Sequence, residues 1–169
     1  MINTERIGHV VLKVRNLERS RAFYTELLGM DIMMEIPAIR AVFLANDRRD
    51  HHEVALFEVG PTAVGLRPNQ IGLAHVAFRL RNEKDLRAAY AEFKEKNVPI
   101  SFTVDHGVTK SIYFRDPDGH ELEVYCDNSP EEIARLANPY MGMNKLEFAP
   151  DDPGLADVIA RFQQTQEQQ

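Results

Sequence analysis

The sequence predicts an α+β fold in which two βαβββ modules, related by a pseudo-twofold axis, form one cup-shaped mixed β-barrel followed by a partly helical C-terminal tail. The first observation is an internal repeat: residues 7–32 match residues 73–98 at an offset of 66 positions. The second is that three short strand-like runs follow each copy. The residues identical between the copies are His9/His75, Val10/Val76, Arg15/Arg81, Asn16/Asn82, Arg21/Arg87, Ala22/Ala88, Tyr24/Tyr90 and Glu26/Glu92.

Each copy opens with a strand that leads into a helix. Alternating residues predict strands at 7–14 and 73–80, and apolar residues at helical spacing predict helices at 17–28 and 83–96. An asparagine stands at the N-cap of both helices, where its side chain accepts a backbone hydrogen bond, and a glycine follows the first helix where a C-cap belongs. These capping residues are Asn16, Asn82 and Gly29.

Three further strands complete each module. They are marked by β-branched and aromatic residues and are separated by polar segments rich in turn-forming residues. We expect them at 32–36, 40–44 and 53–59 in the first copy and at 100–104, 111–114 and 122–125 in the second. Between them lie a charged loop at 45–50 and a linker at 60–70.

The repeat also sets the expected domain organisation. The modules, at about 5–60 and 71–127, form a single domain over residues 1–128, and residues 129–169 form a C-terminal extension. This extension serves either as a lid over a substrate or as a subunit contact, because its methionine and tyrosine side chains suit adaptable apolar surfaces. It contains helix-like stretches at 130–136 and 153–162, a frayed polar end, and Tyr140, Met141 and Met143.

Composition excludes several classes of function. The 169 residues, 44% of them apolar, are enough for one well-packed domain. A net charge of −6 and a pI near 5.5 argue against a nucleic-acid partner, which requires a concentrated basic face. Because there is no signal-peptide pattern and no apolar run near the roughly 18 residues of a membrane span, we expect a cytoplasmic protein without a membrane partner. The single cysteine, Cys126, agrees with a reducing compartment.

The segment HGVTKSIYFRDPDGHELE, residues 106–123, concentrates most of the reactive side chains. Its DPDG sequence predicts a tight turn, because proline presets φ and glycine tolerates positive φ. Strands flank the turn, and alternation places Glu121, Glu123 and Tyr125 on one face. Taken alone, this is a surface hairpin with solvated glutamates. The repeat favours a functional interpretation.

That interpretation depends on the two equivalent histidines. A single histidine in a strand is most often a core or surface residue, but the repeat gives His9 and His75 the same position in both modules, so both can face into one cup. A metal ion there needs a third ligand, and Glu123 is the best-placed carboxylate, with Ala55 as its counterpart in the first module. Two histidines and one carboxylate with open positions are the donor set of non-haem Fe(II) oxygenases.

At these residues the chain resembles the vicinal oxygen chelate superfamily and, within it, the type I extradiol ring-cleavage dioxygenases. The signature hairpin of that group has a histidine, a hydrophobic residue and a tyrosine six and seven positions later, a D-P-x-G turn and a closing glutamate. A second mark is a histidine leading into a V-A-L strand. The resemblance covers about residues 5–127, and the matching residues are His106, Ile112, Tyr113, the DPDG turn, Glu123 and His52 before Val54-Ala55-Leu56.

The resemblance implies a metal-dependent extradiol dioxygenase that cleaves the ring of a catechol-type aromatic and incorporates both atoms of dioxygen. Its metal is Fe(II), or less often Mn(II). An imidazole suits the proton transfer because its unperturbed pKa lies close to 7. The implied roles are metal binding for His9, His75 and Glu123, acid/base catalysis for His52, donation to the bound catecholate for His106, and a second hydrogen bond for Tyr113.

Several alternatives remain open at this point. His51 adjoins His52, and strand alternation lets only one of them face the cup; the V-A-L match favours His52. The substrate is either a monocyclic or a bicyclic catechol. Many relatives carry two such domains, so we expect this single-domain chain to form a homo-oligomer. The same scaffold also supports a glyoxalase-like isomerase, an epimerase or a thiol transferase, and non-enzymatic binders that have lost the metal ligands.

Overall fold

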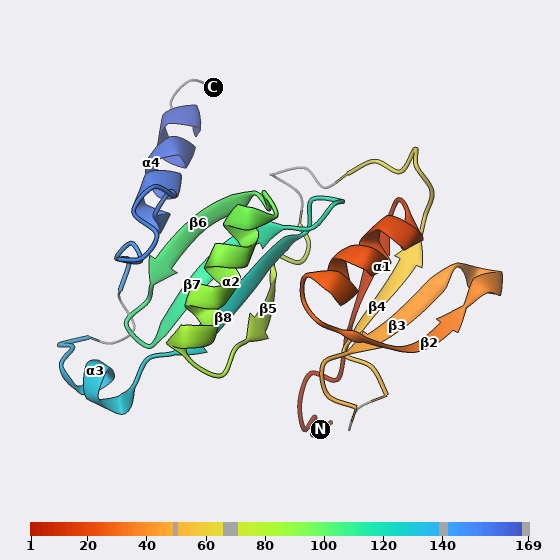
Figure 1. Ribbon diagram of the computed structural model, residues 1–169, viewed down its shortest axis with the longest axis horizontal. Coiled ribbons are helices and arrows are strands. Elements are labelled where there is room, and N and C mark those ends of the chain that lie inside the picture. Colours follow the sequence, from red (N-terminus) through yellow and green to blue (C-terminus); the bar gives the residue numbers. More distant parts are fainter. Residues whose placement is uncertain (49–50, 66–70, 139–141, 167–169) are drawn as a thin grey trace. The chain divides into compact units, whose positions relative to one another are not determined.

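The structure is a computed structural model that describes residues 1–48, 51–65, 71–138 and 142–166. The chain divides into two compact units. Unit 1 consists of Met1–Gln70 with the turn Asp116–Gly119, and unit 2 of Ile71–Arg115 with His120–Gln169. Each unit contains one βαβββ module (Figure 1), which confirms the predicted α+β class and the internal repeat.

Unit 1 is built on a four-stranded sheet of order β1-β4-β3-β2, with α1 packed beside β3 and β4. Strands β1 and β4 are parallel, and the other neighbours are antiparallel. The elements are β1 (Val10–Val14), α1 (Leu17–Glu26), β2 (Asp31–Ile36), a 3-10 turn (Pro37–Ile39), β3 (Ala41–Ala45) and β4 (Val54–Glu58).

Local chemistry explains where α1 begins and how it is held. The side chain of Asn16 accepts a hydrogen bond from the backbone N–H of Arg19 at 2.8 Å, as expected for an N-cap. Tyr24 is fully buried, and its hydroxyl donates to a carboxylate oxygen of Asp116 at 3.2 Å within unit 1. After the helix, Gly29 adopts a φ of 66°, a left-handed conformation that favours glycine.

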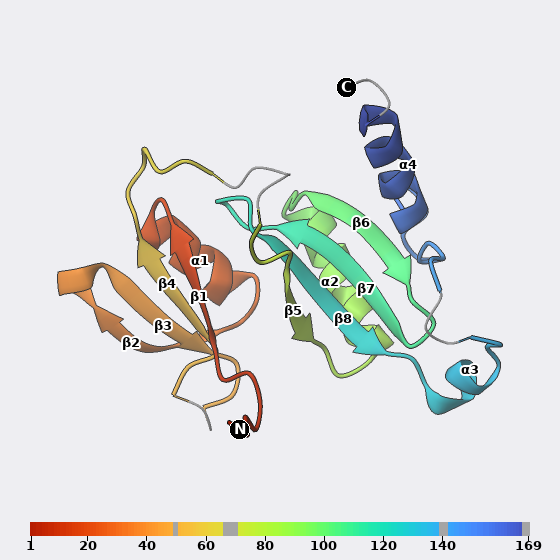
Figure 2. The ribbon, with the colours of Figure 1, turned by 180° about the vertical axis from the view of Figure 1, so that it is seen from behind.

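Unit 2 repeats the arrangement with a sheet of order β5-β8-β7-β6, again with one parallel pair, β5 and β8. Figure 2 shows from behind the face of this sheet that α2 leaves open. The elements are β5 (Val76–Arg79), α2 (Glu83–Glu95), β6 (Ile100–Asp105), β7 (Thr109–Arg115), β8 (Glu121–Asp127), α3 (Pro130–Ala134) and α4 (Leu155–Gln166).

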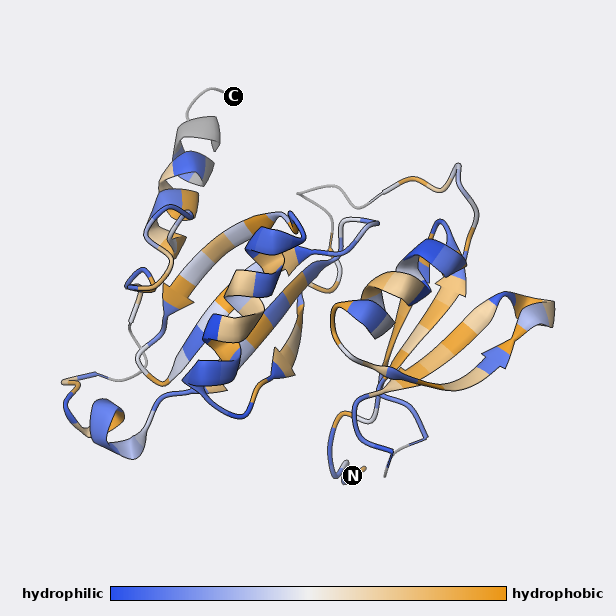
Figure 3. Cartoon of the chain, in the orientation of Figure 1, coloured by the Kyte–Doolittle hydropathy of each residue, from blue (hydrophilic) through white to orange (hydrophobic). Residues whose placement is uncertain are grey.

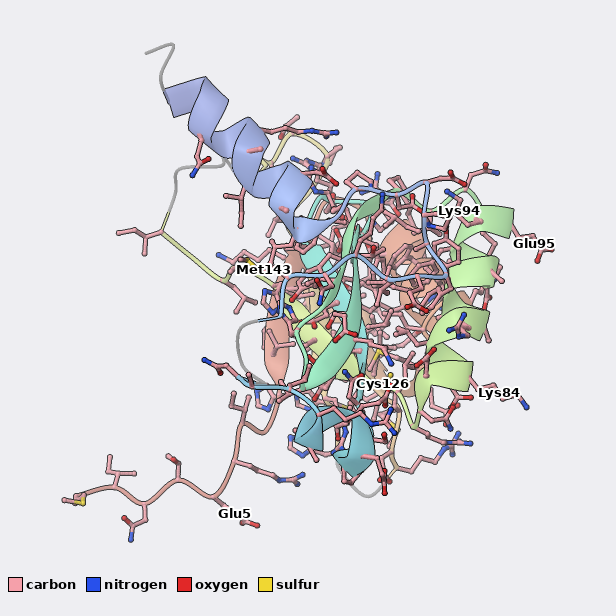
Figure 4. The ribbon with its side chains drawn as sticks, turned by 90° about the vertical axis from the view of Figure 1, so that its left-hand side faces the viewer. Glu5, Lys84, Lys94, Glu95, Cys126 and Met143 are labelled. Atoms are coloured by element: carbon pink, nitrogen blue, oxygen red, sulfur yellow. The ribbon has the colours of Figure 1, made fainter. Side chains whose placement is uncertain are left out.

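Helix α2 shows why the module folds as two layers. Its apolar side chains Leu86 and Phe93 are buried against the sheet, whereas Lys84 and Glu95 point away into solvent (Figure 4). Cys126 is fully buried on the sheet side of the helix. Apolar and polar residues alternate along the strands β6 and β8 (Figure 3), so one face of the sheet packs on α2 and the other carries the reactive groups.

The two modules match even in their irregularities. The pairing of β2 with β3 slips between Ile32 and Met34, and that of β6 with β7 slips between Ile100 and Phe102. A bulge at the same place in both modules bends both sheets in the same way. The repeat therefore extends beyond the region in which the sequence identities are visible.

One detail of the prediction was wrong. The first strand of each module begins at Val10 and Val76, so His9 and His75 lie just before the strands rather than inside them. The described strands hydrogen-bond into two four-stranded mixed sheets, as the two-module fold predicts, and hydrogen bonding within each sheet does not close a barrel. Within each module, the outer positions of the sheet are taken by the first two strands, β1 and β2 in unit 1 and β5 and β6 in unit 2.

The C-terminal extension covers one of these edges. The backbone N–H groups of Thr103 and Asp105 in β6 donate to Pro153 and Asn144, at 2.8 and 2.6 Å. Gly142 lies so close to this strand that an added Cβ would stand 2.4 Å from the carbonyl carbon of His106. Helix α4 then runs beside β6 in both views (Figures 1 and 2).

The extension begins with α3, whose N-terminus carries a capping box formed by Ser129 and Glu132. Within the extension, Met143 is 53% exposed, while Tyr140 and Met141 lie outside the described residues, as do parts of the expected loop at 45–50 and linker at 60–70. Among the helices in the described part of the chain, none is long and apolar enough to cross a bilayer.

Candidate metal centre

Unit 1 gathers three histidines at one edge of its sheet. His9 directly precedes β1, and His51 and His52 precede β4. Since β1 and β4 are parallel neighbours, the residues that lead into them lie side by side. The ring centroids of His9 and His52 are 4.2 Å apart, and those of His51 and His52 are 4.3 Å apart. One nitrogen from each of the three rings lies within 4.8 Å of the others.

His52 is the buried member of this group. It is 8% exposed and packs against the edge of Phe43, with ring centroids 5.0 Å apart, whereas His9 and His51 are exposed. Burial lowers the pKa of His52, and the neighbouring His9 and His51 lower it further. The pair 51–52 precedes the strand, so strand alternation does not govern which way these side chains point.

Unit 2 gathers His75, Glu123 and Tyr113. Glu123 in β8 is opposite Ala77 in β5 and opposite Tyr113 in β7, so the register brings its neighbours to one face. The Nε2 atom of His75 lies 3.1 Å from Oε2 of Glu123. The imidazole of His75 meets the ring of Tyr113 edge-on at 5.3 Å. In the first module, the pair that corresponds to Glu123 and Tyr113 is Ala55 and Phe43, and neither of these side chains can bind a metal ion.

Burial governs the chemistry of this second group. The side chain of Glu123 is 9% exposed, and that of His75 is 40% exposed. Burial raises the pKa of Tyr113, and the charge of Glu123 and its hydrogen bond with the phenol raise it further, so Tyr113 is a neutral hydrogen-bond donor. The donors suit a divalent cation: a nitrogen and a carboxylate oxygen 3.1 Å apart have the spacing of neighbouring ligands around one ion with bonds of about 2.1 Å.

The predicted site residues thus fall into two groups and one outlying position. His9 and His52 belong to unit 1, and His75, Glu123 and Tyr113 to unit 2. His106 is in unit 2 but lies at the other end of β7, where its N–H donates to Thr109. Thr109 is four residues along the strand from Tyr113, a separation of about 13 Å at roughly 3.3 Å per residue.

Comparison with known proteins identifies the family. A model of the glyoxalase/bleomycin resistance protein/dioxygenase superfamily matches residues 6–124. The chain belongs to this superfamily. It is 40% identical over 137 residues to a biphenyl-2,3-diol 1,2-dioxygenase of Rhodococcus globerulus, a match that covers 78% of this chain and 70% of the relative. A second such enzyme of that organism is 34% identical, over 86% of this chain and 77% of the relative.

Other members of the superfamily have different activities. A metallothiol transferase of Staphylococcus epidermidis is 27% identical, over 80% of this chain and 94% of that protein. Among solved structures, a glyoxalase/dioxygenase from Nostoc punctiforme has a TM-score of 0.61 at 23% identity, covering 76% of this chain and all of that one, which supports the fold alone. Membership in the superfamily therefore does not by itself decide which reaction takes place.

A cavity of about 520 Å³ lies beside the group formed by His75, Glu123 and Tyr113 in unit 2. Its wall includes Phe102, whose ring stacks on that of Tyr113 with centroids 4.1 Å apart. Arg115 and Glu121 also line it; they are paired two residues beyond Tyr113 and Glu123, so they lie on the same face of the sheet. The remaining lining residues are Pro99, Ile100, Ser101 and, from α4, Val158 and Arg161.

Two other cavities in unit 2, of about 430 and 400 Å³, contain none of the predicted site residues. Both are lined by Glu132. The ammonium of Lys110 there contacts Glu83 at 2.6 Å and Glu132 at 2.8 Å, which links α2, β7 and α3. These are structural ion pairs, and we place no substrate there.

Sequence reasoning missed three contributors to these groups. Phe43 and Phe102 resemble ordinary strand residues in sequence, and only the cross-strand register brings them to His52 and Tyr113. Val158 was expected in a helix but without a role, since its contribution to the cavity depends on how α4 packs beside β6. The bulges in the second strand of each module were equally hidden.

Proposed function

We propose that this chain is a metal-dependent extradiol dioxygenase that opens the ring of a catechol-type aromatic beside its two hydroxyl groups and incorporates both atoms of dioxygen. The observation that carries the proposal is the contact of Glu123 with His75 and Tyr113 on strands that also bear the signature hairpin. The relatives named biphenyl-2,3-diol 1,2-dioxygenase, at 34 and 40% identity, support the same class of reaction.

The proposed metal ligands are His9, His75 and Glu123, and the proposed ion is Fe(II), or less often Mn(II). This set takes one ligand from unit 1 and two from unit 2. Two imidazoles and one carboxylate leave several positions open, as substrate binding requires. When bound, the ion supplies Lewis acidity and one-electron chemistry for the reaction between a catechol and dioxygen.

His52 is the proposed acid/base residue. Its buried, neutral imidazole accepts a proton from a catechol hydroxyl and returns it later in the reaction, when the ring opens. Its contact with His9 places it beside a proposed metal ligand, with ring centroids 4.2 Å apart. Phe43 limits its movement by packing edge-on against the ring.

Tyr113 and His106 are proposed to orient the substrate. The neutral phenol of Tyr113 donates to Glu123 in this structure, and we propose that it turns to donate to a substrate oxygen when Glu123 binds the ion. His106, in the loop between β6 and β7, is the other proposed donor to the bound catecholate. The cavity bounded by Phe102 and Val158 receives the part of the aromatic substrate that does not react, since its volume of about 520 Å³ lies in the range of small-molecule sites.

The first experiment measures oxygen uptake together with the absorbance of the ring-opened product. Protein loaded anaerobically with Fe(II) is given catechol, substituted catechols and 2,3-dihydroxybiphenyl. We expect one dioxygen consumed per product formed, and loss of both signals in His9→Ala and Glu123→Ala. Glu95→Gln is the matched control, because Glu95 lies on the exposed face of α2 (Figure 4).

A different result would favour the other activities on this scaffold. If one metal ion binds tightly per chain and no catechol supports oxygen uptake, the thiol transferase, isomerase and epimerase reactions replace the dioxygenase. Separate assays of thiol transfer, isomerisation and epimerisation then distinguish among them. The higher identity to dioxygenases than to the metallothiol transferase is the reason to test oxygen uptake first.

A further inference from the structure

The three-histidine group of unit 1 contains more metal-binding capacity than the proposed reaction uses. His9 serves there as a metal ligand and His52 as an acid/base residue, but His51 has no role. Its ring nevertheless lies 4.3 Å from His52 and 5.8 Å from His9, measured between centroids. One nitrogen from each ring lies within 4.8 Å of the other two.

This spacing is close to what a single ion requires. With metal–nitrogen bonds of about 2.1 Å, the nitrogens of neighbouring imidazoles around a tetrahedral ion lie roughly 3.4 Å apart. Small rotations of His9 and His51 would bring the three nitrogens to that distance, and both side chains are exposed and unconfined by the core. His52 is buried and provides the fixed point.

The donors also indicate which ions fit. Three imidazole nitrogens favour Zn²⁺ or Cu²⁺ over Fe²⁺ and Mn²⁺, in keeping with the order of divalent metal affinities. Glu53 is adjacent in sequence, but its carboxylate accepts a hydrogen bond from the backbone N–H of Asn46 at 2.6 Å. Among the described residues of unit 1, the group is therefore a nitrogen-only set, unlike the set proposed for catalysis.

We propose that His9, His51 and His52 form a second cation site, contained in unit 1, that binds Zn²⁺ or Cu²⁺. The inhibitory consequence rests on the proposed function: the site shares His9 with the catalytic metal set and occupies the acid/base nitrogen of His52. Zinc at this site and Fe(II) at the catalytic set then exclude each other. Zinc therefore inhibits ring cleavage, and excess Fe(II) reverses the inhibition.

The test measures Zn²⁺ binding without substrate, by competition with a fluorescent zinc indicator on metal-free protein. In His75→Ala the catalytic set is broken while the three histidines of unit 1 remain, so we expect one Zn²⁺ per chain. Adding His51→Ala should weaken zinc binding by at least tenfold. Residues that only hydrogen-bond to a metal ligand already contribute about 10–100-fold to affinity, and His51 is proposed as a ligand itself. His75→Ala with His120→Ala is the matched control and should retain zinc.

Two results would overturn the proposal: no Zn²⁺ binding by His75→Ala, or equal affinity after His51 is also removed. Thermal unfolding provides a second measure, since Zn²⁺ should raise the Tm of His75→Ala but not that of the double variant. These measurements need no oxygenase activity, so they stand even if the dioxygenase assay fails. If oxygen uptake is observed, His51→Ala should make it resistant to zinc.

Discussion

His52 combines burial with a position beside His9, and these properties give it a testable role. Replacing it with alanine removes the proton acceptor but none of the proposed metal ligands. We expect His52→Ala to lower kcat by about 10²- to 10⁴-fold, the usual contribution of general acid/base catalysis, with the Fe(II) content unchanged. Metal analysis beside oxygen uptake checks this. Loss of iron from the variant would instead identify His52 as a ligand.

Asp118 stabilises unit 1 through contacts that a turn residue does not usually make. Its side chain is 3% exposed and pairs with Arg19 at 2.7 Å and with Arg15 at 3.1 Å. Burial alone would raise the pKa of this carboxyl, but the hydrogen bonds from Arg19 and from the backbone and side chain of Arg15 outweigh it and hold the pKa below its ordinary value of 3.8.

We therefore expect Asp118→Asn to reduce the free energy of unfolding by about 1.5–3 kcal/mol at pH 7, the range for hydrogen bonds to a charged group. Because the folded pKa is depressed, the native carboxylate contributes fully above pH 3.8 and loses its contribution as the pH falls through the lower folded value. Denaturant unfolding of both proteins from pH 7 to pH 2.5 should show the difference shrinking. A constant difference would contradict the electrostatic explanation.

Among the elements, the edge strand β6 depends on the C-terminal extension for its cover. Gly142 can approach this strand only because it lacks a Cβ, which would lie 2.4 Å from His106 and 2.6 Å from the backbone nitrogen of Gly107. We expect Gly142→Ala to destabilise the protein by about 1–3 kcal/mol, as overpacking does. Hydrogen exchange should show faster exchange at Asp105, whose N–H donates to Asn144. Gly154→Ala is the control, since its nearest atoms would be 3.5 Å away.

Helix α4 is the element that we expect to influence substrate choice. Val158 lines the 520 Å³ cavity, whereas its neighbour Ile159 is 39% exposed and does not line it. We expect Val158→Trp to raise the KM for a bicyclic catechol at least about tenfold, a loss of roughly 1.4 kcal/mol, and to leave the KM for catechol nearly unchanged. Ile159→Trp should alter neither. Equal effects on both substrates would mean that the cavity does not receive the second ring.

At the scale of the whole molecule, the proposed metal set depends on two units. We propose that His9, His75 and Glu123 bind the same ion, so mixing His9→Ala with Glu123→Ala during refolding tests whether these ligands come from one chain. Recovery of activity in the mixture would show that ligands from two chains complete one site. Either protein alone serves as the baseline.

We also propose that residues 1–128 act as a single domain and that the protein is a homo-oligomer. Unit 1 leaves several large apolar side chains exposed, a common property of subunit contacts: Ile7, Val11, Ile32, Met34 and Ile39. Light scattering should give a mass of at least two chains. A monomer at micromolar concentration would contradict this proposal.

The amino-acid sequence by itself determined the two modules, their element order and the residues capable of metal chemistry. These features are local or repeated: Asn16 and Asn82 cap helices through contacts three residues away, and the repeat at an offset of 66 positions makes His9 and His75 equivalent. The internal repeat makes Ala55 the counterpart of Glu123, and the strand registers agree. Ala55 pairs with Val11 and Glu123 pairs with Ala77, and each partner lies two positions after the histidine of its module. Periodicity and capping depend on neighbours in sequence, so one sequence suffices to detect them.

Only the tertiary structure decided which side chains meet. Strand pairing joins His75 to Glu123 and Tyr113, and it stacks Phe102 on Tyr113, across separations that no local pattern encodes. It also groups His51 with His9 and His52, although alternation had suggested that only one of the adjacent histidines would contribute. The extension was expected as a lid or a subunit contact, and packing on β6 gives Val158 and Gly142 their roles. The register of paired strands, the covering of the β6 edge and the packing of α4 all depend on contacts between residues far apart in sequence. Local sequence patterns do not specify such contacts.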